Sequence, residues 1–227
     1  MLTIGHRGAQ GYMPENTLSS FQKALDLKVD MVELDVCFCK TGELIVFHDE
    51  RLERTTNGSG YIFDKTISEL KSLNAGNGQQ IPTLEEVLDL VNKRAGVNIE
   101  LKVEHSAKAV ADIIENYILN KGWAEEMFLV SSLNHHELSE LKKIMPKIKI
   151  DASFFGNPID YAKFGSDLGA WSVSLTMEFV NQEFIDDAHT RGLKVIVYTV
   201  NYQEDIKRMK SLGVDGVISD FPDRIGI

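Results

Sequence analysis

The chain alternates short apolar runs with segments of helical periodicity over most of its length. The apolar runs have the length of buried strands, and the intervening segments repeat apolar residues three and four positions apart, as helices do. From residue 98 onward the pattern predicts strands at 98–102, 127–131, 148–152, 170–174, 194–200 and 214–219, and helices at 107–119, 137–145, 159–164, 182–191 and 204–212. Such an alternation predicts a parallel sheet, because parallel strands need long crossover connections.

The first ninety residues follow the same scheme with one interruption. Residues 2–5 and 31–36 are predicted strands, and Asn16 is expected to be the N-cap of the helix between them. Thr83-Leu84-Glu85-Glu86 is a capping box that opens a further helix, to about residue 91. Residues 51–80 are rich in Gly, Asn, Thr and Ser, and an insertion of this length predicts a functional loop or lid.

The number of strands indicates the fold class. Residues 44–47 follow the strand at 31–36 too closely to leave room for a crossover helix, so a hairpin with its tip at Thr41-Gly42 is expected. Counting back from that tip places His48 across from Asp35. If 44–47 is only the returning arm, eight parallel strands remain, the number in a closed (β/α)8 TIM barrel. We therefore predict one α/β barrel domain over 1–227; an open doubly wound sheet is the alternative, although the Gly-rich first turn of nucleotide binders is missing.

Two carboxylates lie side by side on the strand at 31–36. Because side chains alternate along a strand, the apolar residues share one face and Glu33 and Asp35 share the other. Burying two unpaired carboxylates costs several kcal/mol per ion, unless a cation lies between them or one takes a proton. The pair therefore indicates a divalent metal; a solvent-facing edge strand with ordinary surface charges is the alternative.

Further polar residues fall where the predicted strands end, and in a barrel these ends meet at the active site. They are His6, Arg7, Glu33, Asp35, His48, Glu100 and Lys102. Three carboxylates form a hard oxygen site that suits Mg²⁺, Ca²⁺ or Mn²⁺ better than zinc, which leaves the two histidines for proton transfer. Each residue taken singly has an ordinary structural explanation, and only their convergence on one end of the barrel indicates a site. The other four histidines fall in or near predicted helices, where solvated or capping roles are expected.

Composition and charge limit the partners and the cellular compartment that we expect for the protein. A formal net charge of −10 and an isoelectric point near 5.1 argue against binding to nucleic acid or to anionic membranes, so an anionic substrate would need positive charge supplied locally. No apolar stretch approaches 18 residues and the N-terminus has no signal-peptide pattern. Cys37 and Cys39 are expected to be small hydrophobic residues that form no disulfide. These features predict a cytoplasmic protein without stable membrane association; the oligomeric state stays open.

The motifs along the chain resemble those of the glycerophosphodiester phosphodiesterase family. In order, they are His6-Arg7-Gly8, Pro14-Glu15-Asn16-Thr17, Glu33-Leu34-Asp35-Val36, His48-Asp49, Arg54-Thr55-Thr56, Ile81-Pro82-Thr83-Leu84-Glu85-Glu86-Val87-Leu88, Glu100-Leu101-Lys102, Thr199-Val200-Asn201, and Gly213-Val214-Asp215-Gly216 with Ser219-Asp220-Phe221-Pro222. The resemblance covers essentially the whole chain. It departs from the family at Tyr198, where Trp is usual, and at Leu133, where Phe is frequent; both fall where an aromatic wall of the substrate pocket is expected.

The resemblance implies a metal-dependent hydrolase that cleaves a glycerophosphodiester into sn-glycerol 3-phosphate and an alcohol. It implies a divalent metal on the three carboxylates, acid–base catalysis by His6 and His48, and substrate contacts from Arg7, Lys102 and Tyr198. It also implies that the insertion covers the mouth of the barrel. Three alternatives remain: a lysophospholipase D activity at the same site, a metal-dependent sugar isomerase or aldolase on the same fold, and a glycerophosphodiester-binding protein without activity.

Overall fold

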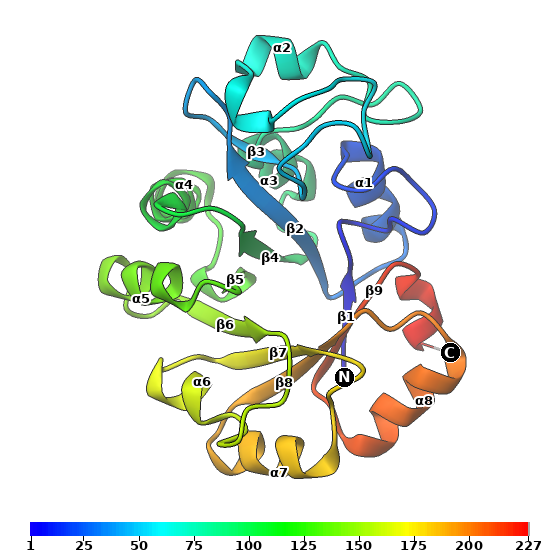
Figure 1. Cartoon of the computed structure of the whole chain (residues 1–227), viewed down its shortest axis with the longest axis vertical. Coiled ribbons are helices and arrows are strands. Elements are labelled where there is room, and N and C mark those ends of the chain that lie inside the picture. Colours follow the sequence, from blue (N-terminus) through cyan, green and yellow to red (C-terminus); the bar gives the residue numbers. More distant parts are fainter. Residues whose placement is uncertain (227) are drawn as a thin grey trace.

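Eight parallel strands close into a barrel in the computed structural model, which describes residues 1–226 (Figure 1). They are β1 (Leu2–Gly5), β2 (Met31–Phe38), β4 (Gly96–Leu101), β5 (Phe128–Ser132), β6 (Lys149–Phe154), β7 (Ser172–Thr176), β8 (Lys194–Tyr198) and β9 (Gly216–Ser219). The barrel is closed because β1 pairs in parallel with both β2 and β9. The predicted (β/α)8 fold is confirmed, and the open sheet is excluded.

Helices follow the strands and form the outer layer of the barrel (Figure 1). They are α1 (Leu18–Asp26), α3 (Leu84–Val91), α4 (Ser106–Lys121), α5 (His135–Ile144), α6 (Lys163–Asp167), α7 (Gln182–Thr190) and α8 (Gln203–Leu212), with short 3₁₀ turns η2 (Glu125–Met127) and η3 (Pro222–Gly226). The helix expected at 159–164 begins only at Lys163, because Tyr161 has φ 48° and a right-handed helix cannot pass through such a residue. Within residues 1–226, no helix combines the length and apolar character needed to cross a bilayer.

The strand β3 (Leu44–Val46) is the returning arm of a hairpin and not a barrel strand. It runs antiparallel to β2, and Val36 lies opposite Val46. The residue across from Asp35 is consequently Phe47, whose N–H donates to the Asp35 carbonyl at 3.0 Å. The expected pairing of His48 with Asp35 is therefore wrong by one residue. His48 follows the strand and reaches the site from the connection beyond it.

The start of α1 also differs from the expectation. Thr17, not Asn16, is the N-cap, and its hydroxyl accepts a hydrogen bond from the Ser20 N–H at 3.3 Å. Asn16 adopts a left-handed conformation with φ 56°, which Asn tolerates better than most residues. This conformation directs its side-chain amide toward the barrel, where it donates to the Asp35 carboxylate at 2.9 Å. A residue expected to cap a helix thus supports a carboxylate of the site.

The insertion at 51–80 packs on a small apolar cluster of its own. It contains the 3₁₀ turn η1 (Ile62–Asp64) and the short helix α2 (Ile67–Lys71), and it lies to one side of the barrel beyond β3 (Figure 1). Cys37 and Cys39 belong to this cluster, both buried and unpaired, as predicted. The cluster fixes the insertion against the outer end of β2. Residues of the insertion can therefore form a stable wall beside His48.

The interior of the barrel is divided into an apolar half and a polar half. One cluster of apolar side chains lies inside the barrel: Ile4, Leu129, Ile196 and Ile218. Trp171 packs against this cluster. On β2, the residues of the opposite face belong to the main core between strands and helices. The polar side chains lie nearer the carboxyl ends of the strands, as is usual for the active site of a barrel. The apolar cluster closes the barrel beneath them and gives the site a floor.

The capping box of α3 supplies a test of this fold. The Glu86 N–H donates to the Thr83 hydroxyl at 3.3 Å, and the Glu86 carboxylate accepts from the Thr83 N–H at 2.9 Å. Thr83→Ala should cost about 1 kcal/mol and lower the melting temperature by roughly 2–4 °C, as measured by thermal unfolding followed by circular dichroism. Thr190→Ala, at the exposed end of α7, is the matched control and should leave the melting temperature unchanged. Equal effects of the two substitutions would contradict the role of the cap.

Candidate metal centre and active site

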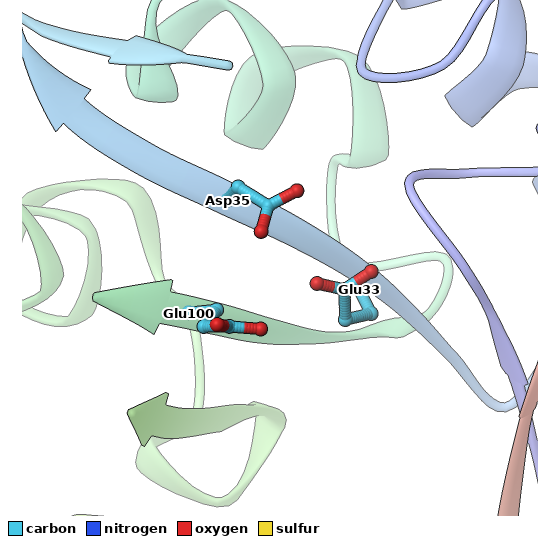
Figure 2. Close-up of side chains that lie close together, drawn as sticks. All are labelled: Glu33, Asp35 and Glu100. Carbon is cyan, nitrogen blue, oxygen red and sulfur yellow. The ribbon is translucent and has the colours of Figure 1, made fainter. Parts of the chain in front are cut away.

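Three carboxylates converge at the mouth of the barrel. Glu33 and Asp35 project from β2 and Glu100 projects from the adjacent β4, with their oxygen atoms directed toward one another (Figure 2). One oxygen of each lies within 4.8 Å of the others. The strand register explains the cluster, since Asp35 is paired directly with Glu100 across the two strands. The sequence-predicted carboxylates are thus brought together.

Burial makes this cluster electrostatically unfavourable when no cation is bound. Glu33 and Asp35 are only 3% and 1% exposed. Desolvation and the charge of Asp35 raise the pKa of the Glu33 carboxyl well above its usual range, and the same two causes raise the pKa of Glu100. The two carboxyl groups are therefore held toward their protonated forms by repulsion as well as by burial.

Two basic side chains compensate part of the negative charge. The Arg7 guanidinium lies 3.3 Å from the Asp35 carboxylate, and the Arg7 backbone N–H donates to Glu33 at 2.9 Å. The Lys102 ammonium lies 3.0 Å from Glu100 and 3.8 Å from Asp35. Two cations against three carboxylates leave a negative excess in a buried site. An all-oxygen donor set with this excess fits a hard divalent cation such as Mg²⁺, Ca²⁺ or Mn²⁺.

His6 stands next to the carboxylates because β1 pairs with β2 and Gly5 lies opposite Val32. Its Nδ1 atom lies 2.6 Å from the Asp220 carboxylate, which leaves Nε2 for the pocket. The amides of Gln10 and Asn201 donate to the same carboxylate, at 2.5 and 2.7 Å. Burial lowers the pKa of His6, but the hydrogen bond to Asp220 and the charge of Glu33 outweigh it, so the pKa is raised overall.

His48 is held by a second chain of charged groups. Its Nδ1 atom lies 2.6 Å from the Asp49 carboxylate, which also accepts two hydrogen bonds from the Arg54 guanidinium, at 2.6 and 2.9 Å. Arg54 in turn donates to Glu15, and Glu15 accepts from Arg7 at 2.6 Å. This chain of contacts, from His48 to Arg7, joins the second histidine to the carboxylate cluster. It also ties the insertion, which supplies Arg54, to the loop after β1.

A cavity of about 250 Å³ connects these groups. It is lined by His6, Arg7, Glu33, His48, Asn98, Glu100, Lys102, Ser131, Leu133, Ser153, Ser174, Tyr198, Thr199 and Ile218. The side-chain oxygen atom of Asn98 is buried and has no hydrogen-bond partner in the structure. Buried polar atoms are nearly always paired, so this oxygen fits a site where a polar ligand donates a hydrogen bond.

Sequence analysis had singled out most but not all of the residues that build this site. Seven of the eight predicted residues line the cavity, and Asp35 lies directly behind them as part of the carboxylate cluster. The other four histidines lie outside the cavity lining. Asp220, Asp49 and the Glu15–Arg54 pair had no role in the prediction. All four residues lie in motifs that resemble those of the family, which could have marked them as candidates. The residues that they bind are known only from the folded chain.

Comparisons with known proteins agree with this geometry. The sequence model of the Glycerophosphoryl diester phosphodiesterase family matches residues 6–224. The chain belongs to this family. It is 36% identical to a glycerophosphodiester phosphodiesterase of Caldanaerobacter subterraneus subsp. tengcongensis, over 99% of this chain and 96% of the relative, and 32% identical to one of Bacillus subtilis, over 98% and 84%.

A solved structure of the family is similar throughout. The phosphodiesterase of Oleispira antarctica, in complex with the product sn-glycerol-3-phosphate, superposes with a TM-score of 0.91 at 30% sequence identity. The match covers 100% of this chain and 95% of that one. The likeness extends over the whole barrel, including the strands that carry the carboxylates.

The contact between His6 and Asp220 can be tested by titration. Asp220→Asn removes the charge that raises the pKa of His6, so this pKa should fall by about 1 or more, as measured by nuclear magnetic resonance of the His6 ring against pH in metal-free protein. Asp223→Asn is the matched control, because Asp223 accepts a hydrogen bond from Tyr12 on the outside of the same turn. A pKa of His6 that is equal in the two variants would contradict the assignment.

Proposed function

We propose that this member of the family hydrolyses glycerophosphodiesters to sn-glycerol 3-phosphate and an alcohol, with a divalent metal and two histidines. The observation that carries the proposal is the convergence of three clustered carboxylates, two basic side chains and two carboxylate-bound histidines on one polar cavity. A sugar isomerase or aldolase would use the carboxylates but gives no reason for two oriented histidines beside Arg7. A binding protein without activity gives no reason for either histidine to be oriented by a carboxylate.

The carboxylates Glu33, Asp35 and Glu100 would hold the metal, which would supply positive charge against the charge that develops on the phosphate. Arg7 and Lys102 add two fixed positive charges beside it. Both are held by carboxylates of the site, so they need little rearrangement when an anionic phosphodiester enters. The physiological metal is a member of the hard divalent group, with Mg²⁺ and Ca²⁺ as first candidates.

The histidines would move the protons. One removes the proton of the attacking oxygen, and the other protonates the oxygen of the leaving alcohol. Each presents Nε2 to the cavity because its Nδ1 is held by a carboxylate, Asp220 for His6 and Asp49 for His48. A carboxylate behind the ring fixes its orientation and stabilises the charged ring that forms during proton transfer.

The cavity suits the glycerol phosphate half of the substrate. Ser131, Ser153 and Ser174 follow one another along its wall on β5, β6 and β7, and Tyr198 adds an aromatic ring. Such a wall offers hydrogen bonds to two hydroxyl groups. The complex of the Oleispira antarctica phosphodiesterase with sn-glycerol-3-phosphate supports glycerol phosphate as the product.

Identification of the phosphorus-containing product tests the function. The purified protein is incubated with glycerophosphocholine and with glycerophosphoethanolamine, in Mg²⁺, in Ca²⁺ or in EDTA. We expect sn-glycerol 3-phosphate in the presence of metal and no turnover in EDTA, as followed by ³¹P nuclear magnetic resonance. Phosphocholine as the product would mean that the other P–O bond breaks, and it would contradict the placement of the substrate.

The histidines can be tested by substitution. His6→Ala and His48→Ala should each lower kcat by about 10²–10⁴-fold, the usual contribution of a general acid or base. His136→Ala, on the exposed face of α5, is the control and should retain full activity. Rates within tenfold of the unsubstituted protein for either site variant would rule out that histidine as an acid–base catalyst.

A further inference from the structure

A second cavity of about 420 Å³ opens on the other side of His48. It is lined by Cys37, Phe38, His48, Asp49, Glu50, Ile62, Phe63, Lys102 and Val103. Two of these residues, His48 and Lys102, also line the first cavity, so the two cavities adjoin at these side chains. Its volume lies within the range of small-molecule sites.

One wall of this second cavity is apolar and packed against the insertion's own core. Ile62 is only 2% exposed and belongs to the same apolar cluster as Cys37, which anchors the insertion to β2. Phe63 follows it at the rim, 52% exposed, and its neighbour Tyr61 stacks on it with ring centroids 5.0 Å apart. Phe38 and Val103 complete the apolar lining from β2 and from the connection after β4. Exposed aromatic side chains that continue into an apolar cavity form the kind of contiguous apolar surface that marks a ligand-binding site.

The charged groups around the cavity do not favour a cationic ligand. Asp49 already accepts two hydrogen bonds from Arg54 as well as its contact with His48. Glu50 lies at the solvent-exposed edge. Lys102 lines the inner side, paired with Glu100, and supplies no negative charge that would hold an ammonium group. The polar serine wall that suits glycerol belongs to the other cavity. What remains is space for uncharged, apolar atoms.

We infer that this second cavity, between β2 and the insertion, binds a hydrocarbon chain on the leaving alcohol of the substrate. The inference rests on the proposed phosphodiester hydrolysis, with glycerol phosphate in the first cavity and His48 at the boundary, next to the departing oxygen. The preferred substrates are then glycerophosphodiesters whose alcohol carries an alkyl or acyl chain. Small polar alcohols leave the cavity unused.

A chain-length series tests the inference. The holoenzyme is assayed with glycerophosphodiesters of methanol, butanol, hexanol and octanol, below their aggregation concentrations, and with glycerophosphocholine. Burying one methylene fully is worth about fourfold in binding, so partial burial of five should raise kcat/KM at least about tenfold from methyl to hexyl, chiefly through KM. Turnover of the methyl ester alone tests the proposed hydrolysis, so the two claims fail separately.

Two variants locate the effect. Phe63→Ser should leave kcat/KM for the methyl ester unchanged and reduce the methyl-to-hexyl gain to about threefold or less. Phe155→Ser is the matched control, because Phe155 is also an exposed aromatic residue, 74% exposed, but lies after β6 and lines neither cavity. This control should retain the full chain-length gain.

A second series distinguishes the two ends of the substrate. It carries the same alkyl chains as ethers on the glycerol, with methanol as the leaving alcohol, and it should show no gain with chain length. Three results would overturn the inference: a flat series on the alcohol side, a gain only on the glycerol side, or glycerophosphocholine as a better substrate than the hexyl ester. A gain that persists in Phe63→Ser as fully as in Phe155→Ser would place the chain elsewhere.

Discussion

The mutual repulsion of three clustered carboxylates, two of them fully buried, is the constraint on which this structure depends. Glu33, Asp35 and Glu100 are held within contact distance of a common point by the pairing of β2 with β4, and the pairing cannot relax without opening the barrel. Leaving such charges unpaired is far more costly than leaving an uncharged polar group unpaired. Much of the surrounding polar architecture serves to offset them. Arg7, Lys102 and Asn16 each contact at least one of the three.

The same excess of negative charge explains why a series of ion pairs extends from the carboxylate cluster to the insertion. Arg7 is shared between Asp35 and Glu15, and Glu15 is shared between Arg7 and Arg54 of the insertion. Arg54 then binds Asp49, the partner of His48. The orientation of the second histidine is thus linked to the same cluster that orders the first loop. The barrel strands fix the positions of the carboxylates. A chain of ion pairs fixes the positions of the polar side chains in the loops above them.

The sequence predicts contacts between residues that are close together along the chain better than contacts between residues that are far apart along it. The alternation along 31–36 placed two carboxylates on one face, because strand periodicity is a local property. Strand counting, with 44–47 treated as a hairpin arm, led to the barrel. The hairpin register was wrong by one residue, since the conformation of the turn after Cys39 decides it. Asn is a residue type that often caps helices, which led to the prediction of Asn16 as the N-cap. In the structure the adjacent Thr17 is the N-cap, and the Asn16 side chain donates to Asp35 instead.

The contacts that orient the histidines were beyond the reach of such reasoning. His6 and Asp220 are separated by 214 positions and meet because β1 and β9 are neighbours in the closed ring. The Glu15–Arg54 pair joins a loop to an insertion whose packing has no periodic signature. Both partners of each pair stand in segments that resemble family motifs, yet only the fold shows which residue binds which. Local patterns predicted the candidate site residues, and long-range topology determined the groups that contact them.

The central claim is that the carboxylate cluster binds one divalent cation, and calorimetry tests it most directly. Metal-free protein is titrated with Mg²⁺ and, separately, with Ca²⁺, alongside Glu33→Gln, Glu100→Gln and the exposed control Glu115→Gln. The account predicts one site per chain for at least one of the two ions, weakened at least tenfold in both cluster variants and unchanged in the control. Equal affinities in all four proteins, or no binding of either ion to the unsubstituted chain, would contradict it.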